Sequence, residues 1–182
     1  MKKILLLILF IIPLFCIAQE KKSSKKPCAP VVNGKVCYVD KVNMTNVSKD
    51  ELFRVINKWA TKTYGKDMFV SNVSANKAKG TILISSKVEL VMSKRETTNM
   101  KFKIYITCTE ENYSVRVTDI VYQYDHPEAK RFKTYPAEDV ILNNGKDNKV
   151  SVIRDPQLFC KATYSFAENI FGDIFYVAWE GD

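Results

Sequence analysis

Polar and apolar side chains alternate along the middle of the chain. Phe102, Ile104 and Ile106, for example, alternate with Lys103 and Tyr105. A period of two places one set of side chains on the buried face of a strand and the other set in solvent, which is typical of an antiparallel sheet. We expect four such strands, which begin near residues 68, 80, 100 and 113. A polar connection at 93–99 and a tight turn at 110–112 would join consecutive strands into a meander.

Two segments have helical periodicity instead. An N-cap at Ser48, with a glutamate three residues later, precedes apolar residues that recur every three or four positions up to Gly65. The second segment opens at Asp155-Pro156, a cap followed by a first-turn proline, and its apolar side chains recur at four-residue steps. These patterns predict one helix between Ser48 and Gly65 and another from Pro156 to Ala178.

The elements occur in the order β-α-β-β-β-β-α, because a short strand at 36–42 precedes the first helix. An antiparallel, curved sheet with two helices packed on one face is an α+β sandwich. Asn33-Gly34, just before the first strand, is a strong signal for a two-residue hairpin turn. Residues 125–154 are rich in turn signals, and we expect a long irregular excursion there with at most one short hairpin.

The N-terminus has the pattern of a secretory signal peptide, with two lysines followed by an apolar block at 4–17. This block is too short to cross a bilayer, which takes about 20 apolar residues, and we expect no transmembrane segment later in the chain. Cleavage after Ala18 would leave Gln19 as the new N-terminus, and it satisfies the rule for small residues before the cut. Lipoprotein processing at Cys16 is the alternative, which the bulky Phe15 before it disfavours. We therefore predict an exported protein, periplasmic or extracellular.

The predicted organisation is a signal peptide at 1–18, a basic flexible tail at 19–35 and one α+β domain at 36–180. The formal net charge of the whole chain is +8. Much of this excess lies in the tail, whose lysines are separated by serines. Such a tail is either a solvated spacer or a contact to an acidic surface of the cell envelope.

Four cysteines remain after the predicted cleavage: Cys28, Cys37, Cys108 and Cys160. An oxidising compartment allows them to form disulfides. Cys28 and Cys37 flank the Asn33-Gly34 turn, but the expected register places Cys37 opposite Pro30, so a bridge between them stays open. The sequence has no CxxC pair and one histidine, and we expect no metal site and no cofactor.

Three stretches resemble a known family of exported Bacteroidota domains. They are SKDELFRVINKWATKTYGK, the glycine-led strand KGTILISSKVEL, and MKFKIYITCTEENYSVRVTDIVYQY. Together with the first strand they cover residues 36–124 and resemble domain of unknown function 4468, a family with a TATA-binding-protein-like fold. The resemblance implies this fold and export, and it implies no activity and no site residues. The chain departs from the family pattern in its cysteines and in the insertion after Tyr124.

The exposed face of the predicted sheet is the candidate binding surface. Lys101, Lys103, Tyr105 and Arg116 would form a basic, partly aromatic face there, a combination that nucleic-acid binders use. Export argues against a nucleic-acid partner, and shared fold does not carry function. The face is then either an ordinary solvated surface or a platform for an unknown protein or envelope component.

Residues suited to catalysis are few in this sequence. His126 follows Asp125 in the excursion, and Glu110 and Glu111 are adjacent carboxylates that fit a turn better than a hydrolytic pair. We therefore expect a non-catalytic binding or accessory domain of the cell envelope. The alternatives are an enzyme with a site near His126 and a secreted inhibitor of host or competitor enzymes that uses the sheet and the excursion as contact surfaces.

Overall fold

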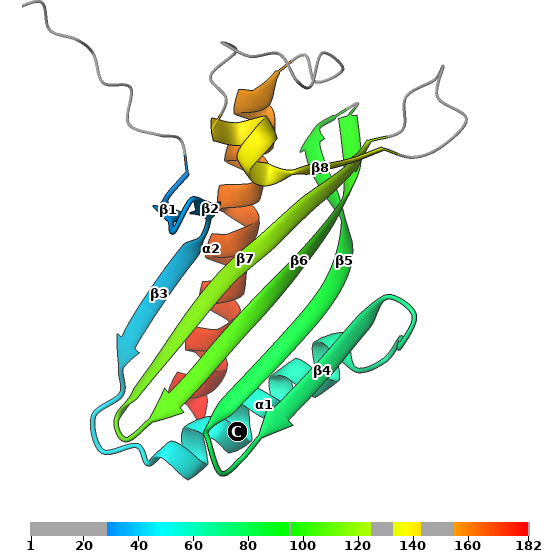
Figure 1. Cartoon of the computed structure of the whole chain (residues 1–182). Helices are drawn as coiled ribbons and strands as arrows, with labels where there is room; N and C mark the ends of the chain where they lie inside the picture. The colour runs from blue at the N-terminus through cyan, green and yellow to red at the C-terminus, as the bar shows by residue number, and fades with distance from the viewer. Residues whose placement is uncertain (1–28, 95, 125–132, 143–154, 182) are drawn as a thin grey trace, which may run out of the picture.

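The fold comes from a computed structural model of the chain, shown in Figure 1, which describes residues 29–94, 96–124, 133–142 and 155–181. The elements are β1 (Val31–Val32), β2 (Lys35–Val36), β3 (Tyr38–Asn43), α1 (Lys49–Tyr64), β4 (Ser71–Asn76), β5 (Thr81–Ser93), β6 (Glu96–Thr109), β7 (Asn112–Tyr124), β8 (Lys133–Pro136), the π-helical turn η1 (Glu138–Leu142) and α2 (Pro156–Glu180). Their order confirms the predicted β-α-β-β-β-β-α core, to which the structure adds the β1–β2 hairpin, β8 and η1.

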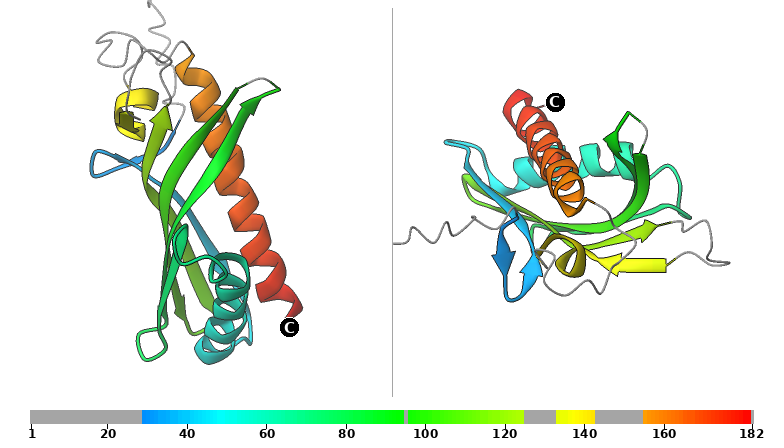
Figure 2. Two further views of the ribbon diagram at one scale, coloured as in Figure 1. Left: turned by 90° about the vertical axis from the view of Figure 1, so that its right-hand side faces the viewer. Right: turned by 90° about the horizontal axis from the view of Figure 1, so that it is seen from above.

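The main sheet has the strand order β3-β7-β6-β5-β4, and β8 pairs with β7. All of these pairs are antiparallel. Both long helices lie on one face of the sheet, as the two views of Figure 2 show. The predicted α+β architecture is therefore confirmed, and the opposite face of the sheet, which we call the open face, is not covered by α1 or α2.

The alternation in the sequence explains which side chains form the core. Ile104 and Ile106 of β6 are almost fully buried against the helices, while Lys103 and Tyr105, which alternate with them, are half-buried on the open face. Burial of apolar side chains stabilises the fold by about 25 cal/mol per Å² removed from water. The largest fully buried side chains come from both helices and the sheet: Leu52, Ile56, Ile82, Ile84, Met100, Ile104, Ile106, Tyr113, Ile120, Tyr122 and Ile174.

The predicted helix boundaries agree with the structure. The Ser48 hydroxyl accepts a hydrogen bond from the backbone N–H of Glu51 at 3.3 Å and caps α1. The backbone N–H of Gly65 donates to the carbonyl of Thr61 at 2.9 Å and ends this helix. Asp155 caps α2, which ends at Glu180, two residues later than expected. Among the described residues, no helix combines the length and the apolar character that a membrane crossing requires.

The Asn33-Gly34 turn forms as predicted, with φ of 51° and 77° at its two positions. This turn joins β1 to β2, so the predicted boundary between a flexible tail and the domain, at 35/36, falls inside a hairpin. The hairpin is held to the rest of the molecule by a hydrogen bond from the backbone N–H of Val36 to the carboxylate of Glu138 at 2.8 Å.

The predicted polar connection at 93–99 is too long, because β5 runs to Ser93 and β6 already begins at Glu96. Thr98 is buried, and its hydroxyl donates to the carbonyl of Gln123 at 2.9 Å, which fixes the start of β6 against β7. β-branched threonines suit a strand better than a loop. Of the predicted excursion at 125–154, the structure describes residues 133–142, which form β8 and η1, and the remainder lies outside the described residues.

Glu110 and Glu111 are turn carboxylates, as the sequence predicts. They lie between β6 and β7, where Glu110 accepts a hydrogen bond from the backbone N–H of Lys49, the first residue of α1, at 3.2 Å. Glu111 accepts one from the backbone N–H of Asn46 at 3.1 Å. The tip of this hairpin thus holds the loop that leads into α1, and a negative charge at a helix N-terminus is favourable.

Candidate functional site

The open face brings together all four residues of the predicted binding surface. Lys101, Lys103 and Tyr105 are alternate residues of β6, and Arg116 lies directly opposite Tyr105 on β7. Lys87 of β5 lies opposite Lys101 on the other side. Figure 1 views the molecule from this face, with both long helices behind the sheet.

Arg116 and Tyr105 form a cross-strand cation–π pair. The guanidinium carbon of Arg116 lies 4.8 Å from the centre of the Tyr105 ring. Such a pair contributes about 0.5–1 kcal/mol at an exposed site and favours a guanidinium stacked on the ring. None of the ion pairs among the described residues involves Arg116.

Asp119 is the acidic centre of the face, and the sequence analysis missed it. Its carboxylate forms ion pairs with Lys35 of β2 and with Lys103 of β6, the latter at 3.1 Å. The hydrogen bond from Lys35 lowers the pKa of Asp119 below its ordinary value, with a further lowering by Lys103 that partial burial opposes. The two lysines belong to separate sheets, so Asp119 connects the β1–β2 hairpin to the open face.

A break in the alternation marks this position. Val117 and Ile120 are both buried, with two residues between them instead of one. The pairing of β6 and β7 shifts register between Lys101 and Lys103, and Asp119 has φ of 52°. A β-bulge inserts one extra residue into a strand and re-aims the side chains around it. The spacing of Val117 and Ile120 was therefore the signal that could have indicated Asp119.

Two hollows flank Asp119 on the open face. The first, of about 240 Å³, lies between the β1–β2 hairpin and the sheet and is lined by Asn33, Lys35, Tyr105, Arg116, Thr118 and Asp119, among others. The second, of about 450 Å³, includes Lys87, Lys101 and Lys103 and reaches the loop before β4. In that loop Phe69 is fully exposed.

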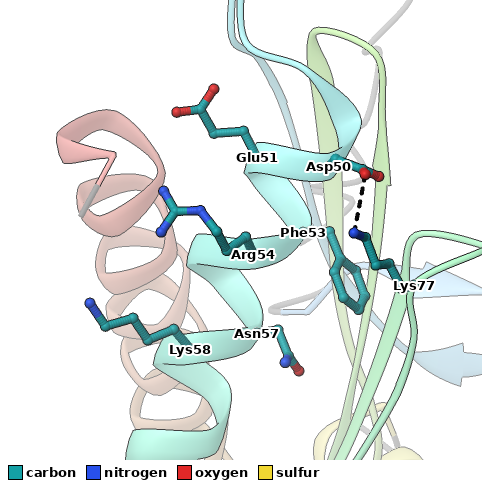
Figure 3. Close-up of a pocket in the computed structure, with 7 residues that line it drawn as sticks. All are labelled: Asp50, Glu51, Phe53, Arg54, Asn57, Lys58 and Lys77. Atoms are coloured by element: carbon teal, nitrogen blue, oxygen red, sulfur yellow. Dashed lines mark ion pairs between the residues drawn. The ribbon is translucent and has the colours of Figure 1, made fainter.

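A third hollow, of about 500 Å³, lies along α1 (Figure 3). Three of its five charged side chains already have partners. Asp50 forms an ion pair with Lys77 at 3.2 Å, drawn as the dashed line, and Arg54 donates to the carbonyl of Gly181 at 3.3 Å. This hollow is therefore a weaker candidate for a ligand site than the open face.

Three of the four predicted disulfide candidates lie in the described part of the chain. Cys37 and Cys108 are free, buried thiols, and burial raises the pKa of Cys108 to about 11. The Cys28–Cys37 bridge that the sequence left open does not form, because Cys37 is free. Its N–H donates to the carbonyl of Pro30 at 3.0 Å, in the register that placed it opposite Pro30. Cys160 is disulfide-bonded. Cys28 lies outside the described residues.

His126, the candidate catalytic residue, lies outside the described residues. Within the described ranges, no group of three or more His, Cys, Asp or Glu side chains is placed to hold a metal ion.

The comparisons with known proteins agree with this architecture. The profile of a family described as a domain of unknown function (DUF4468) with TBP-like fold matches residues 38–123. A TBP-like protein from Parabacteroides distasonis ATCC 8503, known from a crystal structure, is 54% identical in sequence to this chain. The two structures match with a TM-score of 0.79 over 85% of this chain and 99% of that chain. A DUF4468 family protein from Bacteroides ovatus ATCC 8483 is 23% identical, with a TM-score of 0.69 over 83% of this chain and 90% of that chain, a likeness of fold alone. No curated protein matches. The chain therefore belongs to the DUF4468 family, whose members have a TBP-like fold.

Proposed function

We propose that the chain is an exported, non-catalytic binding or accessory domain of the cell envelope, and that its open face contacts the partner. One observation carries this proposal: one face of the six-stranded sheet stays free of both long helices while it carries an excess of cations. The alternation of the strands places Lys41, Lys87, Lys101, Lys103 and Arg116 on this face, with Asp119 and Glu89 as its acids.

The charge of the face favours an acidic partner. Charges on a surface steer association and select partners of opposite sign more than they add affinity. The predicted signal peptide supports a partner in the envelope, and export is the reason why we do not propose nucleic acid.

Charge reversal on the open face tests the proposal. The triple variant Lys41→Glu, Lys87→Glu, Lys101→Glu changes three cations of the face and leaves Asp119, its two lysines and Arg116 intact. The matched control, Lys58→Glu, Lys62→Glu, Lys161→Glu, makes the same change in net charge on exposed positions of the two helices. Each immobilised variant would be exposed to envelope extract, and the captured components compared by mass spectrometry.

We expect a component that the wild-type chain and the helix control both retain and that the open-face variant loses. Retention of every captured component by the open-face variant would overturn the proposal. Export is tested separately on the native protein, by mass spectrometry of its N-terminus. We expect Gln19 as the first residue, whereas a lipid on Cys16 would make the protein a lipoprotein.

A further inference from the structure

The hollow between the β1–β2 hairpin and the sheet, which we call the hairpin cavity, combines features that a small anion site requires. It is about 240 Å³ in volume, which is below the size of most sites for whole small molecules. It therefore suits one chemical group or one side chain of a larger partner. Its walls come from the hairpin on one side, through Asn33 and Lys35, and from β6 and β7 on the other, through Tyr105 and Arg116.

Arg116 is the group in this cavity that is free to bind. The Tyr105 ring covers one side of its guanidinium, at 4.8 Å, and the guanidinium has no ion-pair partner among the described residues. A guanidinium presents its N–H groups as a planar fork, which matches the two oxygens of a carboxylate. Because stacking on the ring already restricts the Arg116 side chain, less side-chain entropy is lost when an anion binds.

Asp119 does not neutralise Arg116, because its carboxylate is already shared between Lys35 and Lys103. Three cations, Lys35, Lys103 and Arg116, therefore surround one carboxylate, and the region around the cavity has an excess of positive charge. Asp119 has a left-handed backbone conformation, φ 52°, which aspartate tolerates better than most residues do. From this position it holds Lys35 at the cavity wall and Lys103 at the neighbouring hollow.

The surroundings favour the carboxylate of a polypeptide side chain. Val39, which lies opposite Arg116 on β3, and Val32 of the hairpin are both nearly half exposed. These two apolar side chains can pack against the methylene groups of an acidic residue.

We propose that the hairpin cavity binds the carboxylate of an acidic side chain on a polypeptide partner, with Arg116 as its main ligand. This inference rests on the proposed function, because it names the chemistry that the open face recognises. It adds a specific pocket to a surface that would otherwise act only through its overall charge.

The test is a titration of the ¹⁵N-labelled mature chain, followed through the side-chain Nε–H of Arg116 and the backbone amides of Thr118 and Asp119. The probe is glutamate with both ends blocked, and its neutral control is blocked glutamine. Glucuronate and inorganic phosphate serve as saccharide and phosphate sources of negative charge. We expect saturable shifts with blocked glutamate, and none with blocked glutamine.

Substitutions of Arg116 show whether binding needs the planar guanidinium or only a positive charge. Arg116→Lys keeps the charge and should weaken binding of blocked glutamate by about tenfold, and Arg116→Gln should abolish it. Lys87→Gln, on the same face but outside the cavity, should leave binding unchanged. Equal binding of blocked glutamine, tighter binding of glucuronate or phosphate, or undiminished binding by Arg116→Gln would each overturn the proposal.

The two proposals fail in different ways. If blocked glutamate does not bind but the open-face variant still loses its captured component, the hairpin cavity is not the site while the face remains a binding surface. If blocked glutamate binds and the open-face variant loses nothing, the cavity is a carboxylate site and the wider face is not the contact surface.

Discussion

Gly80 and Cys108 are in direct backbone contact where the β4–β5 turn meets the end of β6. The N–H of Cys108 donates to the carbonyl of Gly80 at 2.8 Å. A Cβ atom on Gly80 would lie 2.4 Å from the carbonyl oxygen of Cys108, and Gly80 has φ of 66°. Both the space and the backbone conformation therefore require glycine at this position.

We expect Gly80→Ala to destabilise the protein by about 2 kcal/mol or more, because the left-handed conformation and the clash with backbone cannot both relax. Gly172→Ala is the matched control. Gly172 lies inside α2, and a Cβ there would meet nothing within 4 Å. This variant should stabilise the protein by about 0.5–1 kcal/mol, the gain for alanine over glycine within a helix. Urea unfolding followed by circular dichroism measures both, and equal effects of the two variants would contradict the prediction.

Tyr113 and Tyr122 are two buried tyrosines of β7 that differ in their hydrogen bonds. The Tyr122 hydroxyl lies 2.6 Å from that of Thr163 on α2. Thr163 itself donates to the carbonyl of Phe159, so Tyr122 is the donor of this pair. The Tyr113 hydroxyl is buried without a hydrogen-bond partner among the described residues. A buried polar group without a partner costs about 1–3 kcal/mol.

We therefore expect opposite results from the same substitution at these two positions. Tyr113→Phe should leave the free energy of unfolding unchanged or raise it by up to about 1 kcal/mol, and Tyr122→Phe should lower it by about 1–2 kcal/mol. Thermal unfolding of both variants and the wild-type protein at one pH measures these changes in stability. A loss at Tyr113 as large as that at Tyr122 would mean that the Tyr113 hydroxyl has a partner in solution.

Local signals in the sequence predicted the local elements well. Asn33-Gly34 predicted the β1–β2 turn, Ser48 and Asp155 predicted the two helix starts, and the alternation predicted which residues share the open face. These features depend on neighbours within a few positions, where backbone geometry and capping chemistry decide the outcome.

The contacts that build the candidate site are long-range, and local patterns do not contain them. Lys35 and Asp119 are 84 positions apart, and Val36 and Glu138 are 102 positions apart. Neither pair has a spacing that indicates an interaction. The bulge at Asp119 is visible in the sequence as the two-residue gap between buried Val117 and Ile120. That gap does not indicate which lysines the Asp119 carboxylate contacts.

Asp119 should make the stability of the protein sensitive to acid. Its pKa in the folded protein is lower than the ordinary 3.8, because Lys35 and Lys103 stabilise the carboxylate. This contribution to stability is therefore present above the ordinary pKa and is lost as the pH falls through the folded value. In Asp119→Asn, which keeps a side chain that tolerates positive φ, the free energy of unfolding should fall less steeply in that window. The measurement is urea unfolding between pH 6 and about pH 2.5, the region in which carboxylates titrate. An unchanged slope would show that the ion pairs do not stabilise the fold.

Cys108 should contribute to a loss of stability at alkaline pH. Burial raises the pKa of its thiol from 9.0 in an exposed setting to about 11, so the folded protein holds the proton more tightly than the unfolded chain. Stability is then complete below pH 9.0 and falls as the pH rises toward about 11, because unfolding releases a thiol that ionises.

Cys108→Ala removes this titration, and the free energy of unfolding of this variant should depend less on pH across the same window. Buried Tyr38 and half-buried Tyr64 have pKa values that desolvation raises to about 12, and both still lower the stability of the variant as the pH rises toward that value. Thr107→Ala is the control, because Thr107 is the exposed neighbour of Cys108 in β6 and does not titrate. Urea unfolding at a series of pH values under reducing conditions gives the slope for each protein, and the comparison uses slopes because the lost sulfur also changes packing. If the slope of Cys108→Ala equals that of Thr107→Ala, the thiol ionises with nearly the same pKa in the folded and unfolded chains.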